Sequence, residues 1–277
     1  MSDITGTESG ETLNGTSGSD RIDGLGGNDT IYGGDGDDTL DGGEGNDIVY
    51  GDGGNDTILV TGGTSSGTTA TDSVYGGTGI DRLVVDYSLL TNSNGISMGA
   101  PYGGAEGRAG SIAVAGSTRL YFYEIEALTL TSGAGADTVY GLGNDDLIET
   151  GGGIDTIYSA AGAGRDRIDA GEGTDSVSAD WSDLSDAVAL DVNDAAGVTI
   201  GTGATERYLR GVERLEDFRT GSGNDSITLG AGAHAYLGDT VHTNGGDDTV
   251  TVSGGTSAGT TGLDSVFMGA GFDHLVV

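Results

Sequence analysis

The chain has 277 residues, with 57 glycines, 1 proline and no cysteine, and its 44 acidic and 10 basic residues give a formal net charge of −34. A balance this acidic argues against nucleic acid and anionic membrane surfaces as partners and favours cations. The lack of cysteine excludes a disulfide framework and a thiolate zinc site.

One nine-residue phrase occurs six times without a break between Gly6 and Leu59. Its copies begin at Gly6, Gly15, Gly24, Gly33, Gly42 and Gly51. Position 6 of the phrase is acidic, at Glu11, Asp20, Asp29, Asp38, Asp47 and Asp56, and position 8 is aliphatic, at Leu13, Ile22, Ile31, Leu40, Val49 and Ile58. Internal repetition at a fixed period predicts an all-β solenoid.

Each phrase predicts a glycine-rich turn followed by a short strand whose middle side chain faces inward. Two phrases then make one coil of eighteen residues, and alternate phrases stack on the same edge. We expect Glu11, Asp29 and Asp47 on one edge and Asp20, Asp38 and Asp56 on the other.

The stacked carboxylates need a cation. At the strand spacing of about 4.8 Å, two of them repel by roughly 0.8 kcal/mol in water and by about 3 kcal/mol at an effective dielectric of 20. Two aliphatic side chains per coil, worth about 1.5 to 3 kcal/mol each, do not offset the entropy of ordering the coil, which costs about 1 to 2 kcal/mol per residue. Oxygen ligands without soft ligands indicate several Ca²⁺ ions between the turns.

Phrases such as GGDGDDTLD, from Gly33, and GGEGNDIVY, from Gly42, match the pattern G-G-x-G-x-D-x-U-x. With six copies in phase, the chain resembles the repeats-in-toxin (RTX), or haemolysin-type, calcium-binding family. The resemblance implies a parallel β-roll, calcium held by position-6 carboxylates and by turn carbonyls such as those of Gly24, Gly33 and Gly42, and export by a type 1 secretion route. Departures from the consensus are Glu11 at position 6 and Thr7, Thr16, Leu25 and Asp52 at position 2.

Beyond Leu59 the phrase returns in pieces. We divide the chain into a first array (1–84, with a lengthened turn at 60–75), a β-rich interlude (85–131), a second array (132–178), a second interlude (179–219) and a third array (220–277). We expect the interludes to continue the solenoid with longer coils. The further candidate calcium ligands are Asp72, Asp81, Asp137, Asp146, Asp155, Asp166, Asp175, Asp225, Asp248, Asp264 and Asp273. Of these, Asp72, Asp166 and Asp264 lie in irregular turns.

Larger units also repeat. The segment from Thr57 to Val85 recurs from Thr249 to Val277, and YFYEIEAL, from Tyr121, corresponds to YLRGVERL, from Tyr208. The second copy stops at Val277, where the first goes on to Asp86, so we expect a fragment of a longer repetitive protein.

Four aromatic residues in the interludes have two interpretations. We expect Tyr87, Trp181, Tyr121 and Tyr208 to pack in the core or at its ends. The alternative is a sugar-binding platform, which the dispersed tyrosines of the sequence do not favour because they make no obvious stripe.

Catalysis is not expected. Acidic pairs such as Asp37 and Asp38 belong to the repeat, and a phosphate-binding P-loop cannot exist without lysine. His234 replaces a position-6 acid, which indicates a lost calcium site. A transition-metal site formed by His234 and His242 remains an alternative, and His274 has no assigned role.

Two functions remain open. We expect an extracellular structural or adhesive segment of a secreted bacterial protein, with calcium and cell-surface, matrix or like repeats as partners. The alternative is a secretion or folding module attached to an exported enzyme. No apolar run is long enough to cross a membrane, and the N-terminus does not resemble a secretory signal peptide.

Overall fold

The computed structural model describes residues 2–61, 70–90, 95–104, 107–159, 164–192, 194–201, 205–230, 238–252 and 264–277. The regular elements of the described residues are β-strands, apart from one residue in 3₁₀ conformation, Thr205. The chain divides into two compact units, residues 1–142 and 143–277. Because this division falls inside the predicted second array, the array and interlude boundaries stay a prediction.

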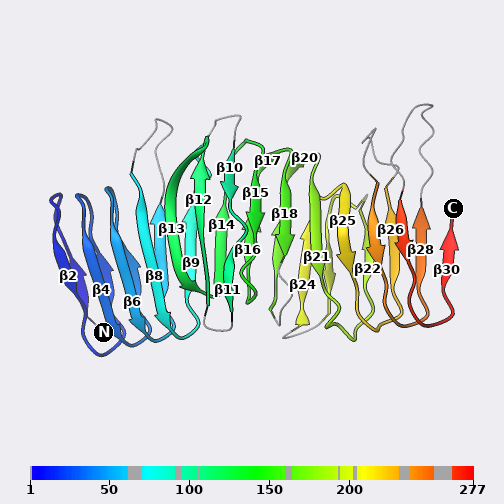
Figure 1. The fold of residues 1–277 in the computed structure, drawn as a ribbon, viewed down its shortest axis with the longest axis horizontal. Coiled ribbons are helices and arrows are strands. Elements are labelled where there is room, and N and C mark those ends of the chain that lie inside the picture. Colours follow the sequence, from blue (N-terminus) through cyan, green and yellow to red (C-terminus); the bar gives the residue numbers. More distant parts are fainter. Residues whose placement is uncertain are drawn as a thin grey trace. The chain divides into compact units, whose positions relative to one another are not determined.

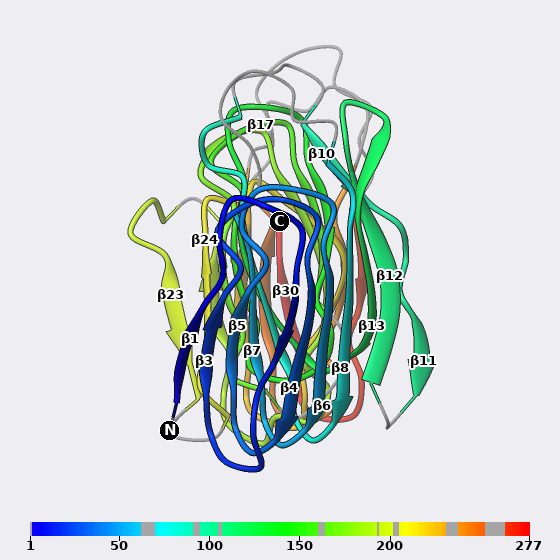
Figure 2. The same cartoon turned by 90° about the vertical axis from the view of Figure 1, so that its left-hand side faces the viewer.

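The first unit contains two sheets that face each other across the coils. One is wholly parallel and runs in the order β1 (Asp3–Thr5), β3 (Arg21–Asp23), β5 (Thr39–Asp41), β7 (Thr57–Thr61), β9 (Arg82–Asp86) and β14 (Ala127–Thr131). The other begins with the parallel strands β2 (Thr12–Asn14), β4 (Thr30–Asp35), β6 (Ile48–Gly53), β8 (Asp72–Thr78) and β13 (Ser117–Ile125). Figure 2 shows β1, β3, β5 and β7 on one side of the coils and β4, β6 and β8 on the other.

The strand register confirms the predicted coil. Ile22 lies opposite Leu40 and Ile31 opposite Val49, so each strand pairs with the one eighteen residues later. The position-8 side chains face inward as expected. Ile22, Ile31, Leu40, Val49, Ile58, Val74 and Leu83 are all buried. The successive parallel strands are visible in Figure 1.

The first interlude continues the coils and adds antiparallel strands. β13 and β14 pair in parallel with β8 and β9. β12 (Gly107–Val114) instead pairs antiparallel with β13, with β10 (Ile96–Met98) and with β11 (Tyr102–Gly104), and β10 pairs in parallel with β15 (Thr138–Tyr140). The reversal between β12 and β13 lies at Ala115 and Gly116, both with positive φ, which is the geometry of a tight two-residue hairpin turn.

The second unit is built in the same way. One sheet runs β16 (Leu147–Glu149), β19 (Arg167–Asp169), β24 (Arg207–Arg210) and β23 (Val198–Ile200), with only β23 antiparallel. A second, parallel sheet runs in the order β18 (Thr156–Ser159), β21 (Ser176–Asp180), β25 (Arg214–Arg219), β27 (Thr240–His242) and β29 (Ser265–Phe267). A third, also parallel, runs in the order β22 (Ala189–Asp191), β26 (Ser226–Leu229), β28 (Thr249–Val252) and β30 (His274–Val276). Two short strands, β17 (Gly152–Gly153) and β20 (Glu172–Gly173), form a separate pair.

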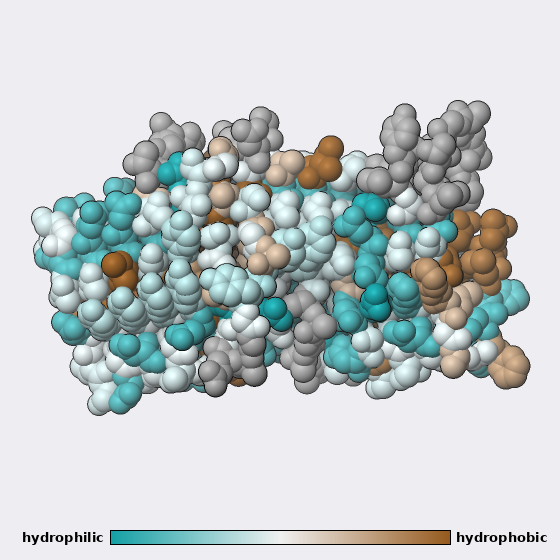
Figure 3. All heavy atoms as spheres, in the orientation of Figure 1, coloured by the Kyte–Doolittle hydropathy of each residue, from teal (hydrophilic) through white to brown (hydrophobic). Residues whose placement is uncertain are grey.

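The internal duplication has a structural counterpart. β28 pairs with β30 as β7 pairs with β9, and Thr249 faces His274 where Thr57 faces Arg82. In the second copy, however, the last coil of the described chain is exposed. Apolar residues gather there in Figure 3, namely Phe267, Phe272, Leu275, Val276 and Val277.

The aromatic predictions are only partly confirmed. Tyr87 and Trp181 are buried, and Trp181 meets the ring edge of Phe218 at a centroid distance of 4.9 Å. The prediction of core packing is wrong for Tyr121, which is 41% exposed because its side of β13 faces outward. Tyr208 is half-buried beneath the guanidinium of Arg167, 4.4 Å from the ring centroid.

The tyrosines do form a stripe, contrary to the interpretation of the sequence. Tyr32, Tyr50, Tyr75 and Tyr123 stack in register, with ring centroids 5.0, 4.8 and 4.8 Å apart. Three of them occupy position 9 of the phrase, whereas Tyr123 belongs to the interlude and joins the stripe only because β13 pairs with β8. Because the ring faces contact one another, the column stabilises the stacked coils.

Candidate metal centres in the acidic turns

The position-6 acids form two ladders, one on each edge of the coils, as the sequence predicts. On one edge, Oδ1 of Asp38 accepts the backbone N–H of Asp20 at 2.7 Å, and Oδ1 of Asp56 accepts that of Asp38 at 2.8 Å. On the other edge, Asp29 accepts from Glu11 at 2.7 Å and Asp47 from Asp29 at 2.8 Å. One oxygen of each carboxylate therefore holds the preceding coil in place.

The second carboxylate oxygen is left without a partner in many of these turns. Oδ2 is buried and accepts no hydrogen bond in Asp29, Asp38, Asp56, Asp81, Asp175 and Asp248. A buried charged oxygen without a donor or a cation is costly. Its repetition along the ladders indicates that a ligand belongs there.

Backbone carbonyls face the same oxygens. A Cβ atom built on Gly33 would lie 2.5 Å from Oδ2 of Asp38 and 2.7 Å from the carbonyl oxygen of Gly51. The corresponding distances from Gly24 are 2.6 Å to Oδ2 of Asp29 and 2.5 Å to the carbonyl oxygen of Gly42. Glycine at position 1 thus keeps open a space that is lined by acceptor oxygens from two successive coils.

The electrostatics favour a cation in this space. Burial, with neighbouring carboxylates adding to it, raises the pKa of Asp56 and Asp175 to about 7 and that of Asp47 and Asp81 to about 6. The cation-free turns therefore hold protons that acids in water would release. A hard divalent cation that accepts several oxygen ligands in a flexible geometry fits this donor set, and Ca²⁺ meets both conditions.

The irregular turns join the ladders as well. Oδ1 of Asp72 accepts the N–H of Asp47 at 3.0 Å, and Oδ1 of Asp264 accepts that of Asp239 at 3.0 Å. Seven more predicted ligands accept a backbone N–H through Oδ1 in the same way. The acceptors are Asp81, Asp137, Asp166, Asp175, Asp225, Asp248 and Asp273, and their donors are, in the same order, Asp56, Ile96, Asp146, Asp155, Val188, Asp225 and Asp248. Asp146 and Asp155, the donors to Asp166 and Asp175, are themselves buried predicted ligands, and the assignment of calcium to each turn stays a prediction.

The first turn differs from the others. Both oxygens of Glu11 accept from Thr7 of the same turn, at 2.9 Å from the hydroxyl and 2.8 Å from the backbone N–H. In the next turn Oδ2 of Asp20 accepts the hydroxyl and the N–H of Thr16, each at 2.7 Å. The hydrogen bond from the Thr16 side chain is the main cause that lowers the pKa of Asp20 to about 2.

Three further acids belong to the ladders but were not predicted from the sequence. Glu126 accepts the N–H of Asp81 at 2.7 Å, Glu213 that of Asp175 at 2.8 Å, and Asp239 that of Leu215 at 2.8 Å. All three stand two residues before an aliphatic residue, as position 6 stands before position 8. The available signal was the acid-x-aliphatic spacing, without glycine at positions 1 and 2 of the phrase.

Position 5 of the phrase carries a second ladder that was also missed. Oδ1 of Asn28 accepts the backbone N–H of Asn46 at 3.0 Å, and Oδ1 of Asp37 accepts that of Asn55 at 2.8 Å. These bonds run toward the following coil, whereas the position-6 bonds run toward the preceding one. The recurrent Asn or Asp before the position-6 acid was the available signal.

The histidines do not assemble into a metal site within the described residues. His242 stacks on Phe267 at 4.4 Å between centroids, and its Nε2 lies 3.5 Å from Oδ1 of Asp217. His274 lies on the exposed strand β30, and His234 lies outside the described residues. The described residues include no group of three or more His, Cys, Asp or Glu side chains placed to hold a metal ion. A calcium site in the turns therefore depends on backbone carbonyls besides carboxylates.

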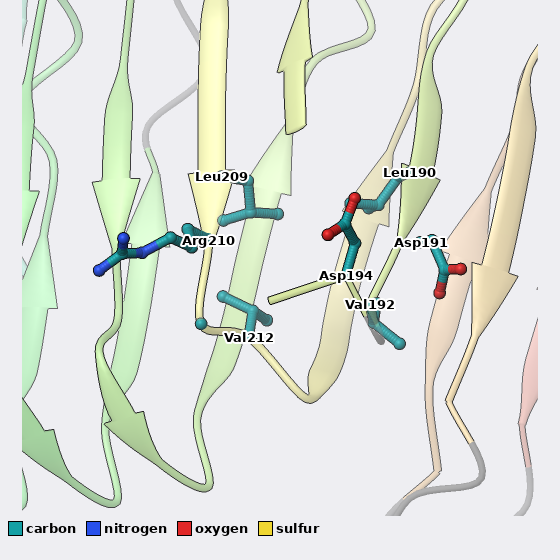
Figure 4. A pocket seen from close by; sticks show the side chains of 8 residues that line it. Leu190, Asp191, Val192, Asp194, Leu209, Arg210 and Val212 are labelled. Carbon is teal, nitrogen blue, oxygen red and sulfur yellow. The ribbon is translucent and has the colours of Figure 1, made fainter. Parts of the chain in front are cut away.

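A small hollow in the second unit offers little room for a ligand. It lies beside β22 and β24 and is lined by residues that include Leu190, Asp194, Leu209 and Arg210 (Figure 4). Its volume of about 10 Å³ holds about one water molecule. Arg210, at its rim, is engaged with Asp169 at 2.8 Å. Within the described ranges, no helix is long and apolar enough to cross a membrane.

Comparison with known proteins agrees with the geometry of the turns. No curated protein matches the chain. The family model for the RTX calcium-binding nonapeptide repeat matches residues 5–40, 24–58, 66–84, 129–157, 159–183 and 215–233, which together make up more than half of the chain. Such repeats imply calcium binding and are typical of secreted bacterial proteins. The chain, with its buried acidic ladders and parallel coils, belongs to the RTX calcium-binding nonapeptide repeat family.

Proposed function

We propose that this chain is a calcium-locked structural or adhesive segment of a secreted bacterial protein. The observation that carries the proposal is the row of buried, unpartnered Oδ2 atoms in the acidic turns, which face backbone carbonyls of the next coil. Without a cation these oxygens destabilise the stacked coils, and with one they join them. The calcium concentration therefore decides whether the coils form.

The calcium concentration at which the coils form follows from the proposed extracellular location. Calcium sites of extracellular modules have dissociation constants of roughly 10⁻⁴ to 10⁻³ M. At the much lower calcium concentration of the cytosol the chain stays expanded and can be exported. Outside the cell, calcium binding supplies the free energy that the thin aliphatic core lacks.

A structural role rests on the repeated architecture. Coils that contact only their neighbours can be added in series, and they present a repeated polar surface. No substrate-sized cavity is needed for this role, and we propose no enzymatic activity for the chain.

Mechanical unfolding of single molecules tests the structural role. The chain is held between two handles and stretched, first in about 10⁻³ M calcium and then in excess chelator. We expect stepwise unfolding against resistance in calcium and the extension of an unfolded chain in chelator. Resistance that is absent in both conditions would refute a structural role, even if calcium binds. Resistance that is equal in both would refute the calcium lock.

A further inference from the structure

Ten of the described turns fall into two groups that differ in the conformation at position 2 of the phrase. Leu25, Gly34, Asp52, Gly77, Gly171 and Asn244 have positive φ, and each belongs to a turn whose acid has an unpartnered Oδ2. We call these open turns. Thr7, Thr16, Gly133 and Gly221 lie outside the left-handed region. Their turns carry the acids Glu11, Asp20, Asp137 and Asp225.

In this second group a hydroxyl donates to the acid, and we call these capped turns. Thr7 and Thr16 donate from position 2 to Glu11 and Asp20. Ser132 and Thr220 donate from position 1 to Oδ2 of Asp137 and Asp225. A further hydroxyl, that of Ser159, donates to Oδ2 of Asp166 at 2.9 Å.

The conformation, not the residue type alone, separates the two groups. Thr243 occupies position 1, as Thr220 does, but position 2 of its turn, Asn244, has a φ of 50°. In this open turn neither the hydroxyl of Thr243 nor Oδ2 of Asp248 has a hydrogen-bond partner. The hydroxyl bond and the left-handed residue thus exclude each other in these two turns.

A capped turn competes with a cation for the same oxygen. In the first two turns both a hydroxyl and a backbone N–H donate to the acid. These donors carry partial positive charge, and they occupy the side of the carboxylate that faces only acceptor oxygens in an open turn. A hydrogen bond to a carboxylate is charge-assisted and stabilises the ionised form. Thr16 is also β-branched, which disfavours the positive φ that an open turn requires.

We propose that the capped turns are calcium-independent, with the serine or threonine hydroxyl in place of the ion. This inference rests on the proposed calcium-dependent folding and divides its turns into two classes. Capped turns open the first array at Thr7 and Thr16, the second at Ser132 and the third at Thr220. Each array therefore begins with a turn that closes without calcium, onto which calcium-dependent coils are added.

Each capped turn with a single departure can be restored to the consensus by one substitution. Thr16→Gly gives GGSGSD and Thr220→Gly gives GGSGND. Both substitutions remove the hydroxyl, and Thr16→Gly also permits positive φ at position 2, where the turn of Thr220 already has Gly221. We expect each of these variants of the full chain to bind about one calcium ion more than the wild type, as counted by isothermal titration calorimetry.

The controls separate the hydroxyl from other effects. Thr16→Ser keeps the hydroxyl and should bind as many ions as the wild type, and so should Ser17→Ala, a change in the same turn at an exposed residue. Thr16→Val removes the hydroxyl but keeps the β-branched side chain, so it should gain no ion and should melt at a lower temperature in calcium.

The outcomes distinguish this inference from the function on which it rests. A wild-type chain that binds no calcium would refute the proposed function. A wild type that binds calcium, with Thr16→Gly and Thr220→Gly folded but unchanged in ion count, would refute the capped-turn inference alone. If Thr16→Gly does not fold in calcium, Thr220→Gly decides, because it lies in another array.

Discussion

At the scale of the residue, each position-6 acid has two different roles. Oδ1 of Asp38 holds the backbone of the preceding coil through the N–H of Asp20, and its buried Oδ2 faces the space beside Gly51. The first role is a structural hydrogen bond that needs no ion. The second needs a cation or a proton. Removing the charge without changing the shape of the side chain separates the two.

Asp38→Asn should weaken calcium binding at its turn by at least about tenfold, which corresponds to about 1.4 kcal/mol. The amide keeps the oxygen that accepts from Asp20 but places N–H donors beside the carbonyl of Gly51, so the calcium-free form should become more stable. Asp37→Asn is the matched control, because its exposed Oδ1 can still accept from Asn55. Calorimetric titration compares the two variants. Equal losses of affinity would contradict the role of Oδ2.

The raised pKa values predict that acid stabilises the calcium-free coils. The pKa of Asp56 and Asp175 is about 7 in the folded chain, against an ordinary value of 3.8, because burial favours the protonated form. Between these two pKa values the folded state binds more protons than the unfolded state. The contribution of these carboxyl groups to the stability of the fold is therefore fully present at low pH and is lost as the pH rises through about 6 to 7.

Circular dichroism of the calcium-free chain measures this effect. The β-sheet signal should increase when the pH falls from about 8 to about 5, and Asp56→Asn should make the change less steep. Saturating calcium should remove the dependence, since calcium displaces the same protons. A β-sheet signal that falls over this interval would contradict the assignment.

At the scale of the element, the geometry of each turn limits which residues can occupy position 2 of the phrase. Gly34 has a φ of 100°, and a Cβ built on it would lie 2.1 Å from the carbonyl oxygen of Thr16. Leu25 and Asp52 adopt a φ of 69° at the same position despite their side chains. The close approach of the backbone of the preceding coil, and not φ alone, therefore demands glycine at Gly34.

Gly34→Ala should destabilise the calcium-bound chain by about 2 kcal/mol or more, because a clash with backbone adds to the cost of the left-handed conformation. Gly53→Ala is the control, since a Cβ there meets nothing closer than 3.5 Å. Thermal unfolding in calcium gives both values. A similar melting temperature for the two variants would show that the turn can relax around a methyl group at position 2.

The regular turns and strands could be predicted from the sequence because each depends on one phrase. Ile22, Ile31 and Leu40 were placed in the core, and Asp20 and Asp38 on one edge, from the period alone. Tyr32, Tyr50 and Tyr75 share position 9 of the phrase, but the place of Tyr123 in the column could not be predicted, since it depends on the pairing of β13 with β8. The antiparallel strand β12 likewise depends on contacts between residues that no periodic pattern connects.

The candidate site was predicted by residue but not by atom. The acids could be identified from the sequence. That Oδ1 accepts a backbone N–H while Oδ2 is left for a cation could not, because it depends on the distance between coils. Glu126 and Glu213 were missed because they lack the glycines at positions 1 and 2 that mark many of the other turns. The capped turns were visible as departures at Thr7 and Thr16, but their hydrogen bonds depend on φ at position 2.

At the scale of the whole molecule, the charge of −34 and the calcium sites belong together. Self-repulsion keeps a chain of this charge expanded and soluble while cations are scarce. In the function we propose, ions bound in successive turns neutralise carboxylates where they are closest, and every ion joins two coils. Under the proposed function, folding follows the calcium concentration, with cooperativity that comes from the contact of each coil with its neighbours.

Far-UV circular dichroism of the purified chain during a calcium titration at about pH 7.5, with magnesium as the control, tests this account most directly. We predict a spectrum with little β-sheet in excess chelator and a cooperative gain of β-sheet with a midpoint at roughly 10⁻⁴ to 10⁻³ M calcium. Magnesium, which demands a smaller and more rigid octahedral site, should not produce it. A fully folded β-sheet spectrum in excess chelator, unchanged by added calcium, would contradict the account.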